Sequence, residues 1–393
     1  MFKDKYKLIG VVLATALVSS AATAAGMMAL IGADQQMVTD ILRFTSLKKY
    51  ISAKYVEPVD DKVLIEGALT GMVNALGDKH SVYLNSERFG KLMDHTDAAF
   101  GGIGIVMGYR DSAAVVLSVM EGTPSEAAGI RPEDEIVAVD GTAAAELTFE
   151  EVAAKIRGEV GSQVTLTIRR YEDKAAGKYT DHEMKITRDR IHMKMVDGQM
   201  LEEGIGYIRI ASFSTTCDKE FKETLAKLKN EDMKGLIIDL RLNHGGLLST
   251  CVEIAKDLVP KGPIVSVVYR DGSKEEFTSN LEKAELPIVV LIDGDSASAS
   301  EILAGALQDT GAATLVGVTS YGKGSVQSII QLPGTKDGLK LTVAKYYTPK
   351  GRSINGVGVT PDIVEDRGQA EQLDKAIEVL KEKIKGEGPK EKP

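Results

Sequence analysis

Two short segments of the chain carry residues whose types could do chemistry together. Ser298 stands in the run Ser-Ala-Ser-Ala-Ser-Glu at 296–301, and Lys323 lies between two glycines in the run Tyr-Gly-Lys-Gly-Ser-Val-Gln at 321–327. A hydroxyl is a weak nucleophile until a base takes its proton, and an amine held in its neutral form is such a base. The two segments therefore predict a serine hydrolase that works without a catalytic histidine.

The sequence around the serines predicts a turn between a buried strand and a helix. Residues 286–292 form an apolar run that Asp293 and Gly294 end, and residues 301–308 combine helical spacing with good helix formers. Such a turn exposes a side chain at the edge of a sheet, and the unpaired N–H groups at the helix start can hold a developing oxyanion. Serines are also common helix caps, so this segment alone leaves both interpretations open.

Lys323 favours the catalytic interpretation. An unperturbed lysine has a pKa of about 10.4, and lowering that pKa to about 7 costs about 4.6 kcal/mol, which burial can supply. Glycines on both sides let the backbone approach closely, as a tight site around an amine requires. Gln327 lies on the same face four residues later, so its amide oxygen is a candidate for orienting the amine. In isolation, a surface lysine in a glycine loop is the alternative.

These runs resemble those of the carboxyl-terminal processing peptidases, a family of serine proteases with a catalytic Ser-Lys pair. A third run, Tyr-Tyr-Thr-Pro-Lys-Gly-Arg-Ser-Ile at 346–354, also looks like the family, and the resemblance extends over roughly residues 40–365. It implies that Ser298 is the nucleophile, that Lys323 is the general base and that Gln327 orients the base. It also implies an acyl-enzyme intermediate.

The resemblance implies two donors for the oxyanion. One is the N–H of Ala299, which follows the nucleophile. In the family the other comes from a glycine loop preceded by Asp-Leu-Arg, which here is the run Asp-Leu-Arg-Leu-Asn-His-Gly-Gly at 239–246. The second donor is expected to be Gly245 or Gly246. His244 stands where the family commonly has proline, and Ser-Lys chemistry does not need a histidine.

Residues 100–168 carry a second, independent signal. A glycine turn is followed by short runs rich in β-branched residues, among them 115–119 and 164–168. These segments resemble a PDZ domain, which binds the free C-terminus of a peptide as an added strand. The resemblance implies that backbone N–H groups of the turn catch the peptide carboxylate, and the expected peptide-binding residues are Gly102, Ile103, Gly104 and Ile105. An all-β domain without a ligand is the alternative.

Other motifs fail on particular residues. Residues 317–323 copy most of a phosphate-binding loop, but Gly324 occupies the position where Ser or Thr must meet magnesium. Ser320 has the Ser-x-x-Lys spacing of penicillin-binding enzymes, yet their partner motifs do not follow. The five histidines form no local cluster and no zinc motif occurs, so we expect neither a metal nor a cofactor. The net charge of −9 argues against nucleic acid as a partner.

The beginning of the chain predicts export. Lys3, Lys5 and Lys7 precede the uncharged stretch 8–32, which as a helix spans about 37 Å, more than the bilayer core of about 30 Å. The run Ala-Thr-Ala at 22–24 has the form of a cleavage site, so a membrane anchor and a removed signal peptide both stay open, beside a buried helix of a cytosolic domain. We expect the remainder outside the cytoplasm, in the cell envelope, membrane-anchored or secreted.

The remaining patterns give the fold class. Helical spacing predicts a helical region after the leader, which in the family helps to form dimers, and strands that alternate with helices after the PDZ-like segment indicate an α/β core. We therefore expect an α/β (α+β) protease core with an inserted mainly-β PDZ domain and an N-terminal helical segment. The expected boundaries are 1–33 for the signal peptide or anchor, 34–95 for the helical region, 96–185 for the PDZ domain, 186–365 for the serine protease core and 366–393 for a charged tail.

The combined expectation is a serine endopeptidase that selects exported proteins by their C-terminal tails. Its expected partners are protein or peptide substrates with free C-termini, the membrane through the N-terminal segment, and a second copy of the chain. Cys217 and Cys251 are expected to be unpaired apolar side chains. The alternative is a binding scaffold in which the PDZ-like domain recruits partners and the core has lost catalysis, and His244 is the one motif change that favours it.

Overall fold

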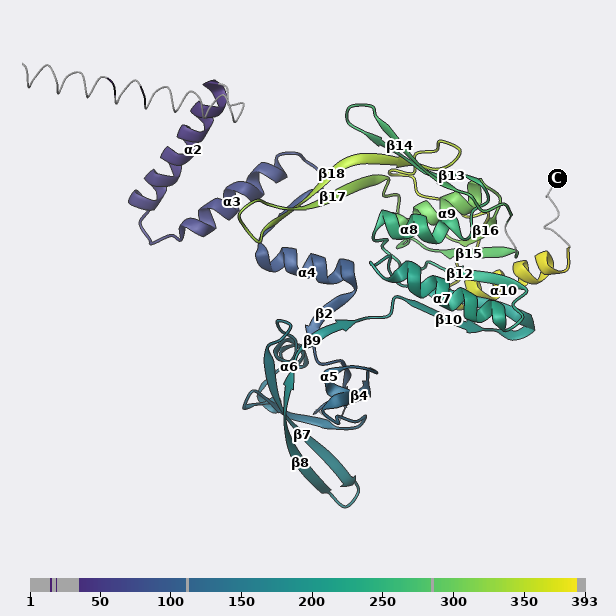
Figure 1. Cartoon of the computed structure of the whole chain (residues 1–393), viewed down its shortest axis with the longest axis horizontal. Helices are drawn as coiled ribbons and strands as arrows, with labels where there is room; N and C mark the ends of the chain where they lie inside the picture. The colour runs from purple at the N-terminus through teal and green to yellow at the C-terminus, as the bar shows by residue number, and fades with distance from the viewer. Residues whose placement is uncertain (1–14, 16–18, 20–34, 111–112, 284–285, 387–393) are drawn as a thin grey trace, which may run out of the picture. The chain divides into compact units, whose positions relative to one another are not determined.

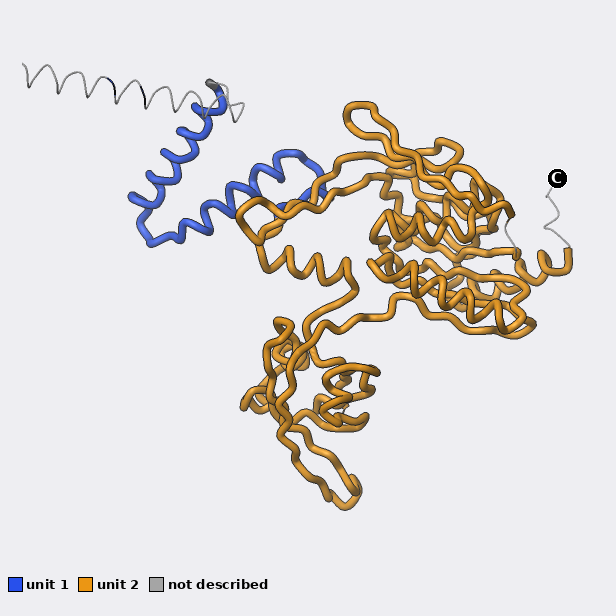
Figure 2. The backbone as a smooth tube through the Cα atoms, viewed as in Figure 1, with its two compact units in different colours: residues 1–83 blue, residues 84–393 orange. Residues whose placement is uncertain are grey.

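The structure is a computed structural model that describes residues 15, 19, 35–110, 113–283 and 286–386 (Figure 1). The expected leader lies almost wholly outside the described residues. Within the described part of the chain, none of the helices combines the length and the apolar character needed to cross a bilayer. The chain divides into two compact units, residues 1–83 and 84–393 (Figure 2).

Residues 35–83 of the first unit form two helices, as the sequence predicts. They are α2 (Gln35–Lys54) and α3 (Asp61–Asn74). Asp60 caps α3, because its carboxylate accepts a hydrogen bond of 2.8 Å from the N–H of Lys62. Large apolar side chains of both helices are exposed, among them Ile41, Leu42, Leu47, Val63 and Met72. Strand β1 (Val82–Leu84) lies at the boundary between the units.

The second unit opens with α4 (Ser86–Asp97) and then a domain of strands, named here the inserted domain, residues 99–192. Its first and last strands pair with each other, and its main sheet has the order β3-β4-β5-β7-β8, so β3 is an edge strand. The helix α6 begins with a capping box between Thr148 and Glu151. The elements are β2 (Ala99–Gly102), β3 (Ile105–Arg110), β4 (Ala113–Val119), α5 (Pro124–Ala127), β5 (Glu135–Val139), β6 (Thr142–Ala143), η1 (Ala144–Glu146), α6 (Phe149–Ile156), β7 (Gln163–Asp173), β8 (Lys178–Thr187) and β9 (Asp189–His192).

A six-stranded sheet forms the centre of the remaining core, in the order β10-β11-β12-β15-β16-β19. From β11 onward neighbouring strands are parallel, and β10 is antiparallel to β11. The strands are β10 (Val196–Met200), β11 (Ile205–Ile210), β12 (Gly235–Asp239), β15 (Ile288–Ile292), β16 (Ala313–Gly317) and β19 (Ile363–Val364), with η2 (Glu202–Gly204) before β11.

Both faces of this sheet are buried, which explains why its central strands are apolar throughout. Alternate residues of β15 show this, because Val290 and Ile292 join one hydrophobic cluster while Val289 and Leu291 join another. The helices α7 (Cys217–Asn230), α8 (Leu248–Lys256) and α9 (Ala299–Asp309) supply residues to the first cluster, and α10 (Gln369–Ile384) supplies residues to the second.

A second sheet joins the strands β17-β18-β13-β14 in this order. Their bounds are β13 (Gly262–Tyr269), β14 (Lys274–Ser279), β17 (Ser325–Gln331) and β18 (Gly338–Tyr347). Strand β13 therefore belongs to this sheet and not to the central sheet. The segment expected as a charged tail contains the long helix α10, which packs on the central sheet.

Candidate active site

Three neighbouring parallel strands deliver the segments that the sequence singles out. The strand β12 leads into the Asp-Leu-Arg and glycine loop, β15 leads into the three serines, and β16 leads into the lysine segment. These strands are adjacent in the order β12-β15-β16. Because parallel strands end at the same edge of a sheet, the three loops meet there, where α/β sheets commonly bind their ligands.

The nucleophile candidate sits in a strained turn. Ser298 directly precedes α9. Its backbone has φ 57° and ψ −113°, a conformation that residues other than glycine rarely adopt. The carbonyl of Asn243 holds the turn in place. It accepts hydrogen bonds from the N–H of Ala297 at 3.0 Å and from the hydroxyl of Ser300 at 2.9 Å. Ser300 is fully buried and Ser298 only partly, so the middle serine is more accessible than Ser300.

A buried carboxylate joins the serine turn to the lysine segment. Glu301 is inaccessible to solvent, and its Oε2 accepts hydrogen bonds from the N–H of Ser298 at 2.8 Å and from the N–H of Lys323 at 2.9 Å. Its Oε1 accepts from the N–H of Gly322 at 2.7 Å and from the hydroxyl of Ser320 at 2.5 Å. One carboxylate thus holds the backbones of the two predicted catalytic residues within reach of a single oxygen atom.

A buried tyrosine makes the matching connection through carbonyl groups. The hydroxyl of Tyr346 donates to the Lys323 carbonyl at 2.6 Å and lies 3.2 Å from the Ser298 carbonyl. Burial, with a smaller contribution from the Glu301 charge, raises the pKa of Tyr346 well above its usual value, so the hydroxyl keeps its proton and acts as a donor. Tyr346 and Glu301 therefore bracket Ser298 and Lys323.

Gln327 lies on β17, the strand that follows Lys323. Its Nε2 donates to the hydroxyl oxygens of Ser325 at 2.8 Å and Thr342 at 3.2 Å. The amide orientation is thereby set by its nitrogen, which leaves the amide oxygen as the atom available to a cation.

The glycine loop approaches the serine turn closely. Gly245 has φ 97°, and a Cβ atom there would lie 2.6 Å from the Ala297 carbonyl oxygen and 2.9 Å from the Ala299 nitrogen. The N–H of Gly245 donates to Oδ1 of the buried Asn243 at 2.8 Å, whereas Gly246 is exposed. Ala299 is the first residue of α9, and its N–H has no acceptor within the helix.

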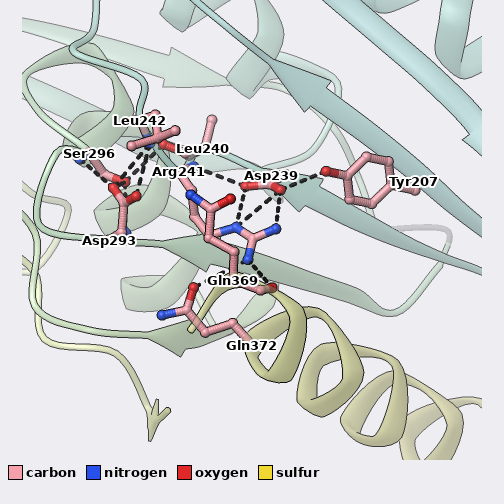
Figure 3. A network of polar contacts seen from close by, with 9 residues as sticks. All are labelled: Tyr207, Asp239, Leu240, Arg241, Leu242, Asp293, Ser296, Gln369 and Gln372. Carbon is pink, nitrogen blue, oxygen red and sulfur yellow. Dashed lines mark hydrogen bonds and ion pairs between the residues drawn. The ribbon is translucent and has the colours of Figure 1, made fainter. Parts of the chain in front are cut away.

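An aspartate ties the glycine loop to the serine turn from a second side. The carboxylate of Asp293 accepts from the N–H of Leu242 at 3.1 Å and from the N–H of Ser296 at 3.0 Å (Figure 3). Leu242 has φ 61°, so this bond holds a strained residue of the loop in place. The loops after β12 and β15 are thus fixed to each other at several points.

Two alternatives from the sequence find no support in the contacts. Ser320 donates its hydroxyl to Glu301 and accepts from the N–H of Val359 at 2.7 Å, so its oxygen is committed to structural bonds. The side chain of His244 is exposed. Neither residue has the contacts of a nucleophile or of its base.

Both thiols are buried and free, as expected. Cys251 donates to the Ala299 carbonyl at 3.1 Å, so it supports the start of α9. Burial raises the pKa of Cys217 to about 12 and also raises the pKa of Cys251. Since the thiolate is the reactive form, these cysteines are poor nucleophiles at neutral pH.

We expect iodoacetamide near pH 8 to leave both cysteines of the native protein unmodified, because burial suppresses the thiolate and blocks access. Mass spectrometry after the reaction measures the number of adducts. The same treatment in concentrated urea is the control and should modify both thiols. Rapid alkylation without urea would contradict the burial described here.

The expected peptide-binding turn lies at the start of the edge strand β3. Gly104 has φ 85°, and a Cβ atom there would lie 2.3 Å from Cβ of Thr123. The Gly104 carbonyl accepts from the N–H of Met120 and from the hydroxyl of Ser125, both at 2.9 Å, and the Ile103 carbonyl accepts from the N–H of Ser125 at 2.9 Å. The carbonyls of the turn are therefore engaged inside the domain, and Gly102 and Ile105 flank them on β2 and β3.

Sequence reasoning missed three residues of the site: Glu301, Tyr346 and Asn243. Glu301 and Tyr346 both stand inside the runs that carry the resemblance, and Asn243 stands in the glycine loop. An acidic residue three positions after the nucleophile was a signal for a capping contact, since a carboxylate there reaches the first N–H groups of a helix. Its bonds to the lysine segment required the fold.

Comparisons with known proteins agree along most of the chain. Residues 204–365 match the peptidase family S41, residues 115–170 match a PDZ domain, and residues 15–88 match the N-terminal domain of the activating protease CtpB. The chain is 40% identical over 338 residues to a carboxy-terminal-processing protease of Bartonella bacilliformis, covering 84% of this chain and 76% of that protein. It is 35% identical over 368 residues to the carboxy-terminal processing protease CtpA of Bacillus subtilis, covering 92% and 77%.

A solved structure is similar as well. The photosystem II D1 C-terminal processing protease aligns with a TM-score of 0.50 and 29% identity, covering 86% of this chain and 90% of that one. The expected α/β core with an inserted PDZ domain and an N-terminal helical segment is confirmed by these matches. The domain boundaries expected from the sequence stay predictions.

Proposed function

The chain belongs to the carboxy-terminal processing proteases of peptidase family S41 and is a serine-type peptidase, and from this premise we propose that it cleaves peptide bonds with Ser298 as nucleophile and Lys323 as general base. The single observation that carries the proposal is that two buried side chains, Glu301 and Tyr346, each contact the backbones of both residues. Glu301 accepts from both of their N–H groups, and Tyr346 lies within hydrogen-bond distance of both of their carbonyls.

The proposed reaction has two halves. The neutral amine of Lys323 takes the hydroxyl proton of Ser298 while the oxygen attacks the scissile carbonyl carbon, and the amine then gives that proton to the leaving amine as the peptide bond breaks. The acyl group remains on Ser298 as an ester. In the second half the same amine takes a proton from water, hydroxide attacks the ester, and the proton returns to Ser298. Gln327 directs its amide oxygen toward the amine.

We assign the oxyanion donors to Ala299 and Gly246. The N–H of Ala299 stands at the start of α9, where the helix leaves it without an acceptor and where the helix dipole favours negative charge. Gly245 and Gly246 were both candidates, and the bond from the Gly245 N–H to Asn243 supports Gly246 as the second donor. Each such donor contributes about 10²–10³ in kcat in serine proteases.

We further propose that the PDZ domain selects substrates by a free C-terminal tail. The tail adds as a strand to the edge of β3, and its carboxylate meets the backbone of Gly102, Ile103, Gly104 and Ile105. We also propose that the protein is exported to the cell envelope, that its N-terminal segment attaches it to the membrane, and that it forms a homodimer. The exposed apolar side chains of α2 and α3 are compatible with a second copy.

We expect Gly104→Ala to weaken recognition of the tail. The added methyl group would collide with Thr123, so the turn must move. The KM for a peptide with a free apolar C-terminus should rise about 10-fold with kcat unchanged, since the chemistry lies elsewhere. Gly141→Ala is the matched control: it has φ 75° in the same domain and nothing within 4 Å of the added Cβ. An equal rise in KM for both variants would contradict the proposed binding turn.

The test of the proposed function compares the region after residue 32 with its Ser298→Ala variant on an unfolded protein substrate. Cleavage by the first and none by the second supports a Ser298 peptidase. Equal degradation by both would remove Ser298 from the reaction. Equal binding of a tail peptide with cleavage by neither would favour the scaffold, for which the replacement of proline by His244 is the one supporting feature.

A further inference from the structure

The helix α10 contacts the strands that lead to the site, and it lies beyond the part of the chain that matches the peptidase family model. The match to the peptidase family S41 ends at residue 365, and α10 begins at Gln369. We propose that α10 is a positioning element of the active site: Gln372 and the carbonyl of Gln369 hold Arg241, and Arg241 sets the glycine loop that supplies an oxyanion donor. This inference rests on the proposed function for its effect on catalysis.

Arg241 is buried and is held from two directions. On one side the guanidinium donates to the Asp239 carboxylate, with Nε 2.9 Å from Oδ1 and Nη2 2.6 Å from Oδ2. On the other side its Nη1 donates to the Gln369 carbonyl at 2.5 Å and to Oε1 of Gln372 at 3.2 Å (Figure 3). A buried guanidinium has to keep its acceptors, because a lost partner leaves charge without compensation.

Gln372 is itself fixed in orientation. Its side chain is 5% exposed, and its Nε2 donates to the Glu365 carbonyl at 2.9 Å, so its amide oxygen is turned toward Arg241. Asp239 is anchored too, since its Oδ2 accepts from the hydroxyl of Tyr207 at 2.6 Å. Both side chains that hold Arg241, Asp239 and Gln372, are therefore oriented by a second hydrogen bond.

The glycine loop starts directly at Arg241. The next residue, Leu242, has φ 61° and is held by Asp293, and the loop then reaches Gly245 and Gly246. A strained conformation persists only when its surroundings determine it, so the loop has little freedom to absorb a shift of Arg241. A displacement at Arg241 is expected to reach the oxyanion donor only a few residues later.

The body of α10 provides the fixed point for this arrangement. Ala376, Val379 and Leu380 are buried in the cluster on the second face of the central sheet. The helix contacts β12, β15 and β16, which are the three strands whose ends carry the glycine loop, Ser298 and the lysine segment. Its N-terminal turn is thus held against the strands that present the site.

The test replaces Gln372 by methionine, which keeps the length of the side chain and removes both polar atoms. We expect kcat on a peptide with a free apolar C-terminus to fall about 10-fold with KM unchanged, because oxyanion geometry acts in the transition state. Gln372→Glu keeps an acceptor for Arg241 but loses the donor to the Glu365 carbonyl, so it should recover part of kcat. Unchanged kcat in Gln372→Met would overturn the proposal.

Ile384→Ala is the matched control, because it removes apolar packing at the far end of the same helix, away from Gln372 and Arg241. At an equal loss of thermal stability it should leave kcat unchanged. If it lowers kcat as much as Gln372→Met does, α10 acts through stability alone and the proposal is wrong.

A second measurement separates this inference from the proposed function. In a Ser298→Ala background, hydrogen exchange followed by mass spectrometry should show faster exchange of residues 241–247 in Gln372→Met and not in Ile384→Ala. Equal exchange of that loop in both variants would overturn the positioning role. A wild-type chain without peptidase activity would instead sink the proposed function, while the exchange comparison would still decide the role of α10.

Discussion

Lys323→Arg is expected to lower peptide cleavage by at least about 10³-fold while the chain stays folded. A guanidinium keeps its proton in proteins, so it cannot accept the proton of Ser298, although its size and charge are close to those of lysine. The backbone contacts of residue 323 to Glu301 and Tyr346 use its N–H and its carbonyl, which the substitution retains. Initial rates on a fluorogenic peptide measure the loss.

Lys345→Arg is the control for this substitution. Lys345 is exposed on β18 and pairs in register with Ser325, two residues after Lys323. The change has the same chemistry at a nearby position and should leave the rate unchanged. Near-normal activity of Lys323→Arg would show that another group removes the proton.

Glu301→Gln is expected to damage both catalysis and stability. The carboxylate accepts hydrogen bonds from four donors, from Ser298, Ser320, Gly322 and Lys323, whereas an amide offers one oxygen and turns its NH2 group toward two of them. Buried donors left without an acceptor cost about 1–3 kcal/mol each, so with two of them the free energy of unfolding should fall by about 2–6 kcal/mol. We expect kcat to fall about 10²-fold or more, because the serine turn and the lysine segment separate.

Urea unfolding followed by circular dichroism measures the stability of this variant, and initial rates measure kcat. Glu202→Gln removes one carboxylate from an exposed position and should change neither quantity. If Glu301→Gln keeps both wild-type values, the Glu301 carboxylate does not hold the serine turn and the lysine segment together. The main structural argument for pairing Ser298 with Lys323 would then fail.

The candidate nucleophile and the candidate base could be singled out in the sequence because each stands in a short run with its own local pattern. Ser298 follows an apolar strand and precedes a helix, and Lys323 lies between glycines. The structure agrees with the predicted turn, and it adds the positive φ of Ser298. This backbone strain depends on contacts of the turn with Asn243, which lies far away in the sequence, as well as with Glu301, so the local pattern alone could not reveal it.

The choice between Gly245 and Gly246 could not be made from the sequence, since two adjacent glycines have the same local preferences. The proposed assignment to Gly246 rests on the contact of Gly245 with Asn243, which commits the N–H of Gly245. The role of Tyr346 likewise could not be predicted locally. Tyr346 lies on β18, and its contacts with Ser298 and Lys323 depend on how the strands are arranged in the fold.

The end of the chain shows where composition misleads. Its many charges suggested a tail, whereas the structure has the helix α10 over Gln369–Ile384. The apolar positions of α10 cover one face of the central sheet, and Gln372 reaches Arg241 far away in sequence. A few buried residues in a charged segment sufficed for packing because the partner surface on β12, β15 and β16 is itself apolar.

The central claim is that the acyl group of the substrate passes through Ser298. Its most direct test is mass spectrometry of the chain quenched in acid during turnover of a peptide ester, followed by mapping of the modified peptide. The account predicts a mass increase equal to the acyl group, located on Ser298 and absent from the Ser298→Ala variant. An acyl group on a different residue, or turnover by the Ser298→Ala variant at the wild-type rate, would contradict it.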